Sequence, residues 1–321
     1  MKKLLSLLLC AVMLLGISAC GTGNEGKNVV RMSPEELLSY AEENLSEQAP
    51  IMADALNFDR KYGEIQHGTY YSKTLKRERG YNILLPPDYD ESVSYPVVYA
   101  LHGYWGDEYS LLDQGDGTIK CREVLGNLIA EGKAVPMIVV FPDIFCHETK
   151  EDCDGMNDEN NKAYDNFINE LKNDLMPHIE KTYPVLTGRK NTAITGFSMG
   201  GRESIAIGLQ LTDKIGYIGA ACPAPGVVPD CISEDAKMVF PSGKEPYLLM
   251  ISAGTDDTVV YSTPEGYHNV FTNNGVPHIW HLVKGGGHWG STIKPHLYNF
   301  LQFCFKEPEV SGEENGVDIA E

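Results

Sequence analysis

One serine lies in a pattern that can make its hydroxyl a nucleophile. Residues 196–200 read Gly-Phe-Ser-Met-Gly and match Gly-x-Ser-x-Gly, in which a sharp strand-to-helix turn exposes the serine hydroxyl at a sheet edge. The bare pattern is weak, but residues 191–195 resemble a strand and residues 202–209 resemble a helix, as the turn requires. The alternative is an ordinary turn in which Ser198 only caps the helix. The context favours a nucleophilic Ser198.

A serine hydroxyl needs a base, and the base needs a carboxylate that orients it. The apolar run 247–253 is followed by two candidate carboxylates, Asp256 and Asp257. The apolar run 279–283 is followed by Lys, three glycines and His288, so a mobile turn presents this imidazole. The chain order Ser, Asp, His is that of α/β-hydrolases. We therefore expect the serine and the histidine to work with one of the two aspartates.

The oxyanion formed by such an attack needs two preorganised N–H donors. The backbone N–H of Met199, at the expected start of the helix, is the first. We assign the second to the N–H of Tyr104, in the loop after the apolar run 96–101, with that of Trp105 as the alternative. His102 in this loop is expected to brace the turn and receives no chemical role.

Short apolar runs alternate with helical segments along most of the chain. Strands are predicted at 69–75, 81–85, 96–101, 136–141, 191–197, 247–253 and 279–283, the first two as an antiparallel pair. Helices are predicted at 121–131, 161–182, 199–211, 262–274 and 292–305, the second with a break at Pro177. This alternation predicts an α/β fold, with a mostly parallel central sheet covered by helices on both faces. No linker divides residues 68–305, so a single domain is expected.

The first residues have the features of a bacterial lipoprotein signal peptide. Two lysines precede the apolar residues 4–15, a stretch shorter than a membrane span, and Ile-Ser-Ala precedes Cys20. We expect a signal peptide at 1–19, cleavage before Cys20 and a lipid on the Cys20 sulfur. The protein would then be exported and lipid-anchored to the outer face of the bacterial cell membrane. Ordinary secretion is the alternative.

Three further segments complete the expected organisation. Residues 20–67 comprise the lipidated cysteine, a tether and a helical extension, whose start is marked by Ser33 and by Glu36 three residues later. Residues 68–306 form the expected catalytic domain. Residues 307–321 form an acidic tail.

The cysteines suit an exported protein, in which disulfides can form. Cys146 with Cys153 and Cys222 with Cys231 are close in sequence and lie in loop-like segments. Connectivity cannot be deduced from sequence, and buried free thiols are the alternative. The spacings match no Cys/His zinc pattern, and no metal is expected.

Four motifs together resemble a known group of enzymes, the esterase D-related carbohydrate esterases, which include family 1 feruloyl and acetylxylan esterases. The motifs are Arg-Gly-Tyr-Asn-Ile-Leu-Leu-Pro-Pro-Asp-Tyr at 79–89, Tyr-Pro-Val-Val-Tyr-Ala-Leu-His-Gly at 95–103, Gly-Phe-Ser-Met-Gly-Gly at 196–201 and Gly-Gly-Gly-His at 285–288. The resemblance covers about residues 69–305. It implies an α/β-hydrolase that removes ester-linked acyl groups from plant polysaccharides with a Ser-Asp-His triad and no cofactor. The nucleophile is then Ser198, the base His288 and the acid Asp257.

Aromatic residues near the expected site depart from the family pattern. Phe197 stands where the family more often has His, and Tyr104 with Trp105 replaces smaller residues, so these side chains are expected to reshape the pocket. Trp105 and Trp289 are the candidates for substrate contact. Trp280, inside a predicted strand, is expected in the core.

An acidic loop, residues 146–161, follows the strand predicted at 136–141 and is expected at the same edge of the sheet. It could bind Ca²⁺ or cover the substrate, but Gly155 does not fall where an EF-hand loop needs its glycine. A solvated loop is favoured.

The predicted function is that of a surface-anchored serine esterase acting on feruloyl or acetyl groups of plant polysaccharides or oligosaccharides. The alternatives are a general carboxylesterase, lipase or peptidase of the same fold, and a solute-binding lipoprotein, which would not need a catalytic triad. The 26 Lys and Arg against 45 Asp and Glu give a net charge of −19, which excludes a nucleic-acid partner. The oligomeric state stays open.

Overall fold

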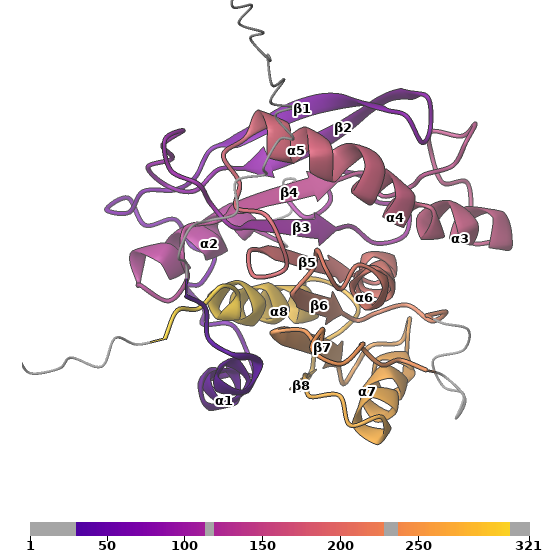
Figure 1. Ribbon diagram of the computed structural model, residues 1–321. Coiled ribbons are helices and arrows are strands. Elements are labelled where there is room, and N and C mark those ends of the chain that lie inside the picture. Colours follow the sequence, from indigo (N-terminus) through magenta and orange to yellow (C-terminus); the bar gives the residue numbers. More distant parts are fainter. Residues whose placement is uncertain (1–29, 113–118, 228–236, 309–321) are drawn as a thin grey trace, which may run out of the picture.

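The computed structural model describes residues 30–112, 119–227 and 237–308. Its strands are β1 (Ile65–Ser72), β2 (Arg77–Leu84), β3 (Val97–Leu101), β4 (Ile138–Pro142), β5 (Thr192–Phe197), β6 (Tyr217–Ala221), β7 (Leu248–Gly254) and β8 (Ile279–Val283). They form one sheet in the order β1-β2-β4-β3-β5-β6-β7-β8 (Figure 1). β3 to β8 run parallel, whereas β2 is antiparallel to both β1 and β4.

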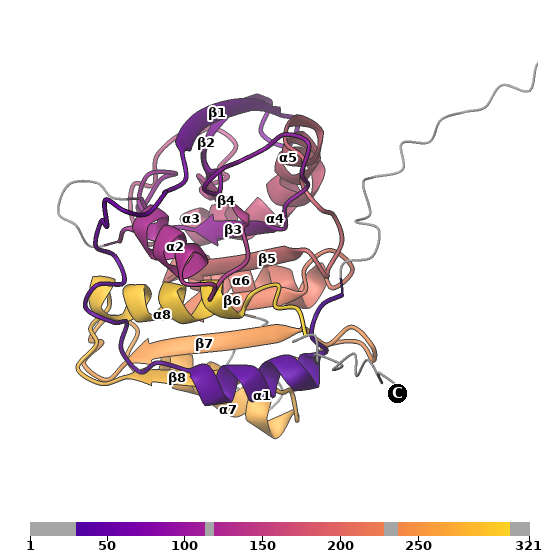
Figure 2. The same cartoon turned by 90° about the vertical axis from the view of Figure 1, so that its left-hand side faces the viewer.

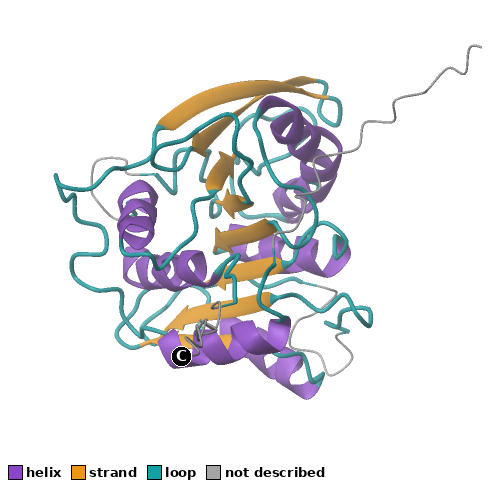
Figure 3. Cartoon of the chain, turned by 60° about the vertical axis from the view of Figure 1, so that its left-hand side comes forward, coloured by secondary structure: helices purple, strands orange, loops and turns teal. Residues whose placement is uncertain are grey.

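Helices cover both faces of the sheet (Figure 3). They are α1 (Pro34–Asn44), α2 (Cys121–Ala130), α3 (Asp158–Asp165), α4 (Phe167–Glu170), α5 (Met176–Thr182), α6 (Met199–Gln210), α7 (Thr263–Asn273) and α8 (Gly290–Phe303). Helices α3 to α7 supply buried side chains to one core, and α1, α2 and α8 to the other. Strand β3 contributes side chains to both cores, because alternate side chains of a strand point to opposite faces of the sheet. Tyr99 lies in the first core, and Val98 and Ala100 lie in the second.

The predicted α/β architecture is confirmed, and all seven predicted strands are present within a few residues of their expected bounds. The prediction misses β6, which has small residues where a buried strand more often has branched ones. One of them, Gly219, has no room for a side chain, because an added Cβ would lie 2.5 Å from Thr195 Oγ1. The helix predicted at 161–182 is divided into α3, α4 and α5, with a π-helical turn, Leu171–Leu175, before Pro177.

The N-terminal helix α1 begins as predicted and packs against β7 and β8 (Figure 2). The Ser33 hydroxyl accepts a hydrogen bond from the Glu36 N–H, and the Glu36 carboxylate accepts one from the Ser33 N–H. Leu37 and Ala41 are buried in the core beneath it.

The two ends of the described chain meet beside the start of β5. The Arg31 guanidinium donates to the backbone oxygen of Phe305 at 2.7 Å and to Asn191 Oδ1 at 3.2 Å. The Met32 N–H donates to the Lys306 oxygen at 2.9 Å. Both ends therefore leave the folded body at the amino end of the parallel strands.

Some predictions fall outside the described residues. Residues 1–29, with the predicted signal peptide and Cys20, are among them, as are Cys231 and residues 309–321. No helix within the described ranges has the length and apolar character needed to cross a membrane. Cys146 and Cys153 are free thiols and form no disulfide, and Cys222 is a buried free thiol.

Candidate active site

Ser198 lies in the turn between β5 and α6, at the carboxyl edge of the sheet. Its φ of +54° lies in the left-handed region, which costs free energy for a residue with a side chain. The turn is tight because its glycines lack Cβ atoms: one added at Gly200 would lie 2.3 Å from Leu101 O, and one at Gly196 would lie 2.4 Å from Gly200 C. The strand-turn-helix setting predicted for the serine is therefore present.

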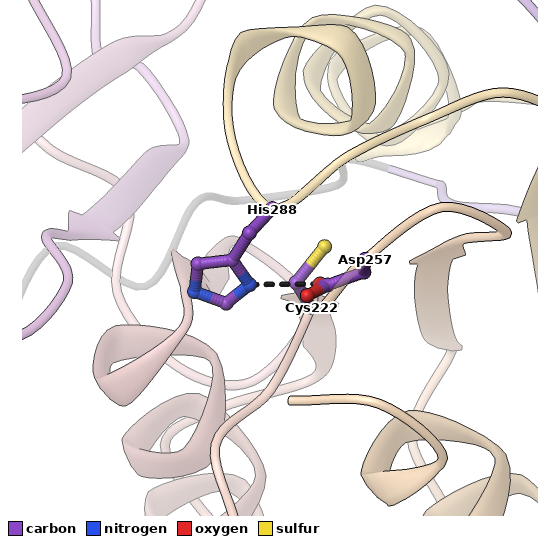
Figure 4. Close-up of side chains that lie close together, drawn as sticks. All are labelled: Cys222, Asp257 and His288. Carbon is purple, nitrogen blue, oxygen red and sulfur yellow. Dashed lines mark hydrogen bonds and ion pairs between the residues drawn. The ribbon is translucent and has the colours of Figure 1, made fainter. Parts of the chain in front are cut away.

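Three side chains from three strand ends form one hydrogen-bonded chain. His288, in the loop between β8 and α8, has its Nε2 3.1 Å from Ser198 Oγ. Its Nδ1 lies 2.7 Å from Oδ2 of Asp257, which follows β7 (Figure 4). A neutral imidazole that donates from Nδ1 to the carboxylate keeps Nε2 free to accept the serine proton.

Asp257 is the one of the two adjacent acids that contacts His288. Its Oδ1 accepts hydrogen bonds from the N–H groups of Val259 at 2.8 Å and Val260 at 3.2 Å. Burial raises the pKa of Asp257, but the hydrogen bonds from His288 and the two N–H groups outweigh burial, so the pKa lies below its usual value. Asp256 is exposed, and its carboxylate accepts a hydrogen bond from the Thr255 hydroxyl at 2.9 Å.

The backbone N–H groups of Met199 and Tyr104 flank the serine. Met199 is the first residue of α6, and Tyr104 follows Gly103, where an added Cβ would lie 3.4 Å from Ser198 Cβ. Within the described part of the chain, neither N–H has a hydrogen-bond partner. The Trp105 N–H, in contrast, donates to the Tyr164 hydroxyl at 3.1 Å. Of the two predicted candidates in this loop, Tyr104 is thus the one with a free donor.

His102 braces the same loop, as expected. Its Nδ1 lies 2.7 Å from the backbone oxygen of Gly103, and its Nε2 accepts a hydrogen bond from the Ile144 N–H at 2.9 Å. Both ring nitrogens are therefore occupied by backbone groups, which fixes the position of Gly103 and hence of Tyr104.

Aromatic rings line the histidine side of the site. The Phe197 ring centroid lies 4.8 Å from that of His288 and 4.9 Å from that of Trp289. Trp289 is 43% exposed and Trp105 is 59% exposed, so both can contact a ligand. Trp280 is half-buried against the core and stacks on a histidine ring, consistent with the expected structural role.

A buried polar network beneath the site was missed by the sequence analysis. Ser252 Oγ on β7 lies 3.0 Å from His281 Nδ1 on β8 and 2.7 Å from His296 Nδ1 on α8. His296 Nε2 lies 2.9 Å from Thr195 Oγ1 on β5, and His281 Nε2 lies 3.0 Å from Glu47 O. The network thus joins the three strands that carry the serine, the aspartate and the histidine. Burial lowers the pKa of His281 and lowers that of His296 to about 3. The available signal was a polar residue inside each of three apolar runs.

The acidic loop at 146–161 is held by internal ion pairs. Lys150 Nζ lies 3.1 Å from Glu159 and 3.2 Å from Asp154, and His147 Nε2 lies 3.0 Å from Glu159. The loop touches the site region through the Tyr104 hydroxyl, which donates to Gly155 O at 3.2 Å. Its described carboxylates belong to no group that could hold a metal ion.

Comparisons with known proteins match this same region of the chain. Residues 72–290 match the model of the family named Esterase. The structure resembles that of a CE1 ferulic acid esterase from Anaeromyces mucronatus in complex with ferulic acid, with a TM-score of 0.75 and 40% sequence identity. That match covers 82% of this chain and 98% of the other. The resemblance inferred from the sequence motifs is confirmed.

Two relatives are much longer proteins. The chain is 32% identical over 166 residues to an endo-1,4-beta-xylanase/feruloyl esterase from Xylanibacter ruminicola, a match covering 50% of this chain and 22% of that protein. It is 21% identical over 299 residues to endo-1,4-beta-xylanase Y from Acetivibrio thermocellus, covering 84% of this chain and 26% of that protein. The chain thus spans about a quarter of the length of these relatives.

Proposed function

We propose that this chain, which belongs to the Esterase family, hydrolyses carboxylic esters through an acyl-enzyme formed on Ser198. The observation that carries the proposal is the hydrogen-bonded chain from Ser198 through His288 to Asp257, with distances of 3.1 and 2.7 Å. Acyl transfer also requires hydrogen-bond donors for the oxyanion, and the free N–H groups of Met199 and Tyr104 beside the serine supply them.

Each group has a defined role in the proposed reaction. His288 Nε2 takes the proton of Ser198 as the serine oxygen attacks the ester carbonyl carbon, and Asp257 stabilises the resulting imidazolium. The Met199 and Tyr104 N–H groups bind the oxyanion, and each such donor is worth about 3 kcal/mol in comparable enzymes. His288 then protonates the leaving alcohol. Water, activated by the same imidazole, releases the acid and restores the serine.

The proposed substrate is a plant polysaccharide or oligosaccharide that carries feruloyl or acetyl esters. Support comes from the similarity to a ferulic acid esterase over 98% of that protein's length. The exposed faces of Trp105 and Trp289 suit this substrate, because aromatic rings bury the flat surfaces of other rings well.

We propose that the protein acts outside the cell, anchored by lipid on Cys20. The support is the sequence alone: an apolar stretch at 4–15 followed by Ile-Ser-Ala-Cys. Anchoring would hold the enzyme at the outer face of the membrane, where released oligosaccharides reach it.

The test compares the purified protein with its Ser198→Ala variant on methyl ferulate, acetylated xylan, a short p-nitrophenyl ester and emulsified triglyceride. We expect the native protein to hydrolyse the sugar or aryl esters fastest and the variant to fall to near background. Faster cleavage of triglyceride would favour a lipase instead. Hydrolysis of none of these esters would favour a binding protein, and full activity of the variant would refute the serine mechanism.

A further inference from the structure

Cys222 lies beside Asp257 and His288 and has no role in the proposed reaction. It follows β6, and its N–H donates to Ser252 O at 2.8 Å on the neighbouring strand. Its side chain is completely buried, and its backbone has a φ of +45°, in the left-handed region. Figure 4 shows the Cys222 thiol beside the carboxylate of Asp257, close to the hydrogen bond between that carboxylate and the imidazole of His288.

The three side chains bring three kinds of metal-ligating atom close together. The Cys222 sulfur, an Asp257 oxygen and a His288 nitrogen all lie within 4.8 Å of one another. In a tetrahedral zinc site with bonds of 2.0–2.3 Å, neighbouring ligand atoms lie about 3.3–3.8 Å apart. Small side-chain movements therefore suffice to close the group around one ion.

We propose that Cys222, Asp257 and His288 form a binding site for a thiophilic divalent cation such as Zn²⁺. The bound ion inhibits the enzyme. A thiolate, an imidazole and a carboxylate are zinc ligands, whereas Mg²⁺ and Ca²⁺ require mainly oxygen atoms. The site is distinct from a catalytic metal centre because the ion would occupy the space between the base and its acid.

The inhibition follows from which nitrogen of His288 the ion binds: Nδ1 faces Asp257, and Nε2 faces Ser198. The Cys222 sulfur lies in one group with an Asp257 oxygen and a His288 nitrogen, and a cysteine ligates zinc as a thiolate. Binding of the ion releases the thiol proton to solvent. The ion takes Nδ1 of His288, so the ring proton moves from Nδ1 to Nε2. Nε2 then faces Ser198 as a donor and cannot accept its proton. This inhibition rests on the proposed function, whereas binding of the ion does not.

The first experiment titrates Zn²⁺ against ester hydrolysis in the native protein and in Cys222→Ala, with Cys153→Ser as a matched thiol control outside the cluster. We expect inhibition of the native and Cys153→Ser proteins that is reversed by EDTA, and at least a tenfold higher inhibitory concentration for Cys222→Ala. Mg²⁺ and Ca²⁺ at the same concentrations should leave activity unchanged. Equal sensitivity of Cys222→Ala, or no inhibition of the native protein, would overturn the proposal. If the alanine variant does not fold, Cys222→Val fills the same space without a sulfur.

The second experiment detects the bound ion without any activity. Co²⁺ added to the Ser198→Ala variant should give a thiolate-to-cobalt charge-transfer band in the near ultraviolet. The band should disappear when Cys222→Ala is added to the same variant. Its appearance would support the site even if the ester substrates were wrong, and its absence would overturn the site even if the esterase proposal held.

Discussion

Replacing Asp257 by asparagine tests whether this carboxylate orients the catalytic base. Oδ1 of Asp257 accepts hydrogen bonds from two N–H groups, so an asparagine would keep its carbonyl oxygen at that position. Its NH₂ group would then face Nδ1 of His288, to which the native carboxylate oxygen lies 2.7 Å away. An NH₂ group can only donate, so the ring proton would be forced onto Nε2. In that tautomer the histidine cannot accept the proton of Ser198.

The size of the effect follows from the tautomer. In a comparable serine hydrolase, an imidazole held in the wrong tautomer lowers kcat by about 10⁴. This corresponds to about 5.4 kcal/mol of activation free energy. We expect a loss of this order in kcat for Asp257→Asn with little change in KM, because the Asp257 side chain is only 1% exposed and faces the histidine. The assay is steady-state hydrolysis of methyl ferulate, with thermal unfolding to verify the fold.

Asp256 provides the matched control at the next position. It is exposed, and its carboxylate accepts a hydrogen bond from the Thr255 hydroxyl, so Asp256→Asn should lose less than about tenfold in kcat, or about 1.4 kcal/mol. A larger loss of kcat in Asp256→Asn than in Asp257→Asn would show that Asp256, and not Asp257, orients His288. Near-full activity of both variants would refute the Ser-His-Asp mechanism.

Three further changes test other parts of the molecule. Gly200→Ala places a Cβ 2.3 Å from Leu101 O, so α6 must shift. We expect kcat to fall at least about tenfold and Tm to fall as well. An unchanged Tm would contradict the close packing. Between pH 6.5 and 3 the unfolded chain protonates His296, whereas the folded chain, with its pKa lowered to about 3, does not. The stability contributed by this group is therefore complete above pH 6.5 and is lost as the pH falls, at up to about 1.4 kcal/mol per pH unit. Urea unfolding should show a shallower pH dependence in His296→Gln, and identical slopes would exclude His296 as the cause. Cys20→Ala should move the protein from the membrane fraction to the medium, and equal membrane retention would exclude lipidation as the anchor.

The sequence predicted those parts of the site that depend on local pattern. The turn at Ser198 is readable because its glycines, strand and helix are contiguous, and His288 is readable because its loop follows an apolar run directly. The choice between the neighbouring Asp256 and Asp257 needed a family resemblance, since local pattern does not say which carboxylate turns inward.

The parts that the sequence analysis missed depend on contacts between distant segments. Cys222 lies 35 residues before Asp257 and 66 before His288, so no metal-ligand spacing marks the group. His296 joins Ser252 and Thr195 only because three strands and a helix meet beneath the site. Such polar residues resemble ordinary interruptions of an apolar run until the sheet order is known.

The meeting of Arg31 with Phe305 and of Met32 with Lys306 determines how this domain can be joined to other proteins. These contacts lie at the start of β5, and Ser198 lies at its other end, about 20 Å away at 3.3 Å per residue. A fusion partner, a solid support or a neighbouring module attached at either point therefore begins on the side of the domain away from the ester. Because the two points are adjacent, the domain could also be inserted into a loop of another protein without stretching it. This geometry suits a domain of a larger protein, and in the two matched xylanases the region similar to this chain makes up about a quarter of a longer chain.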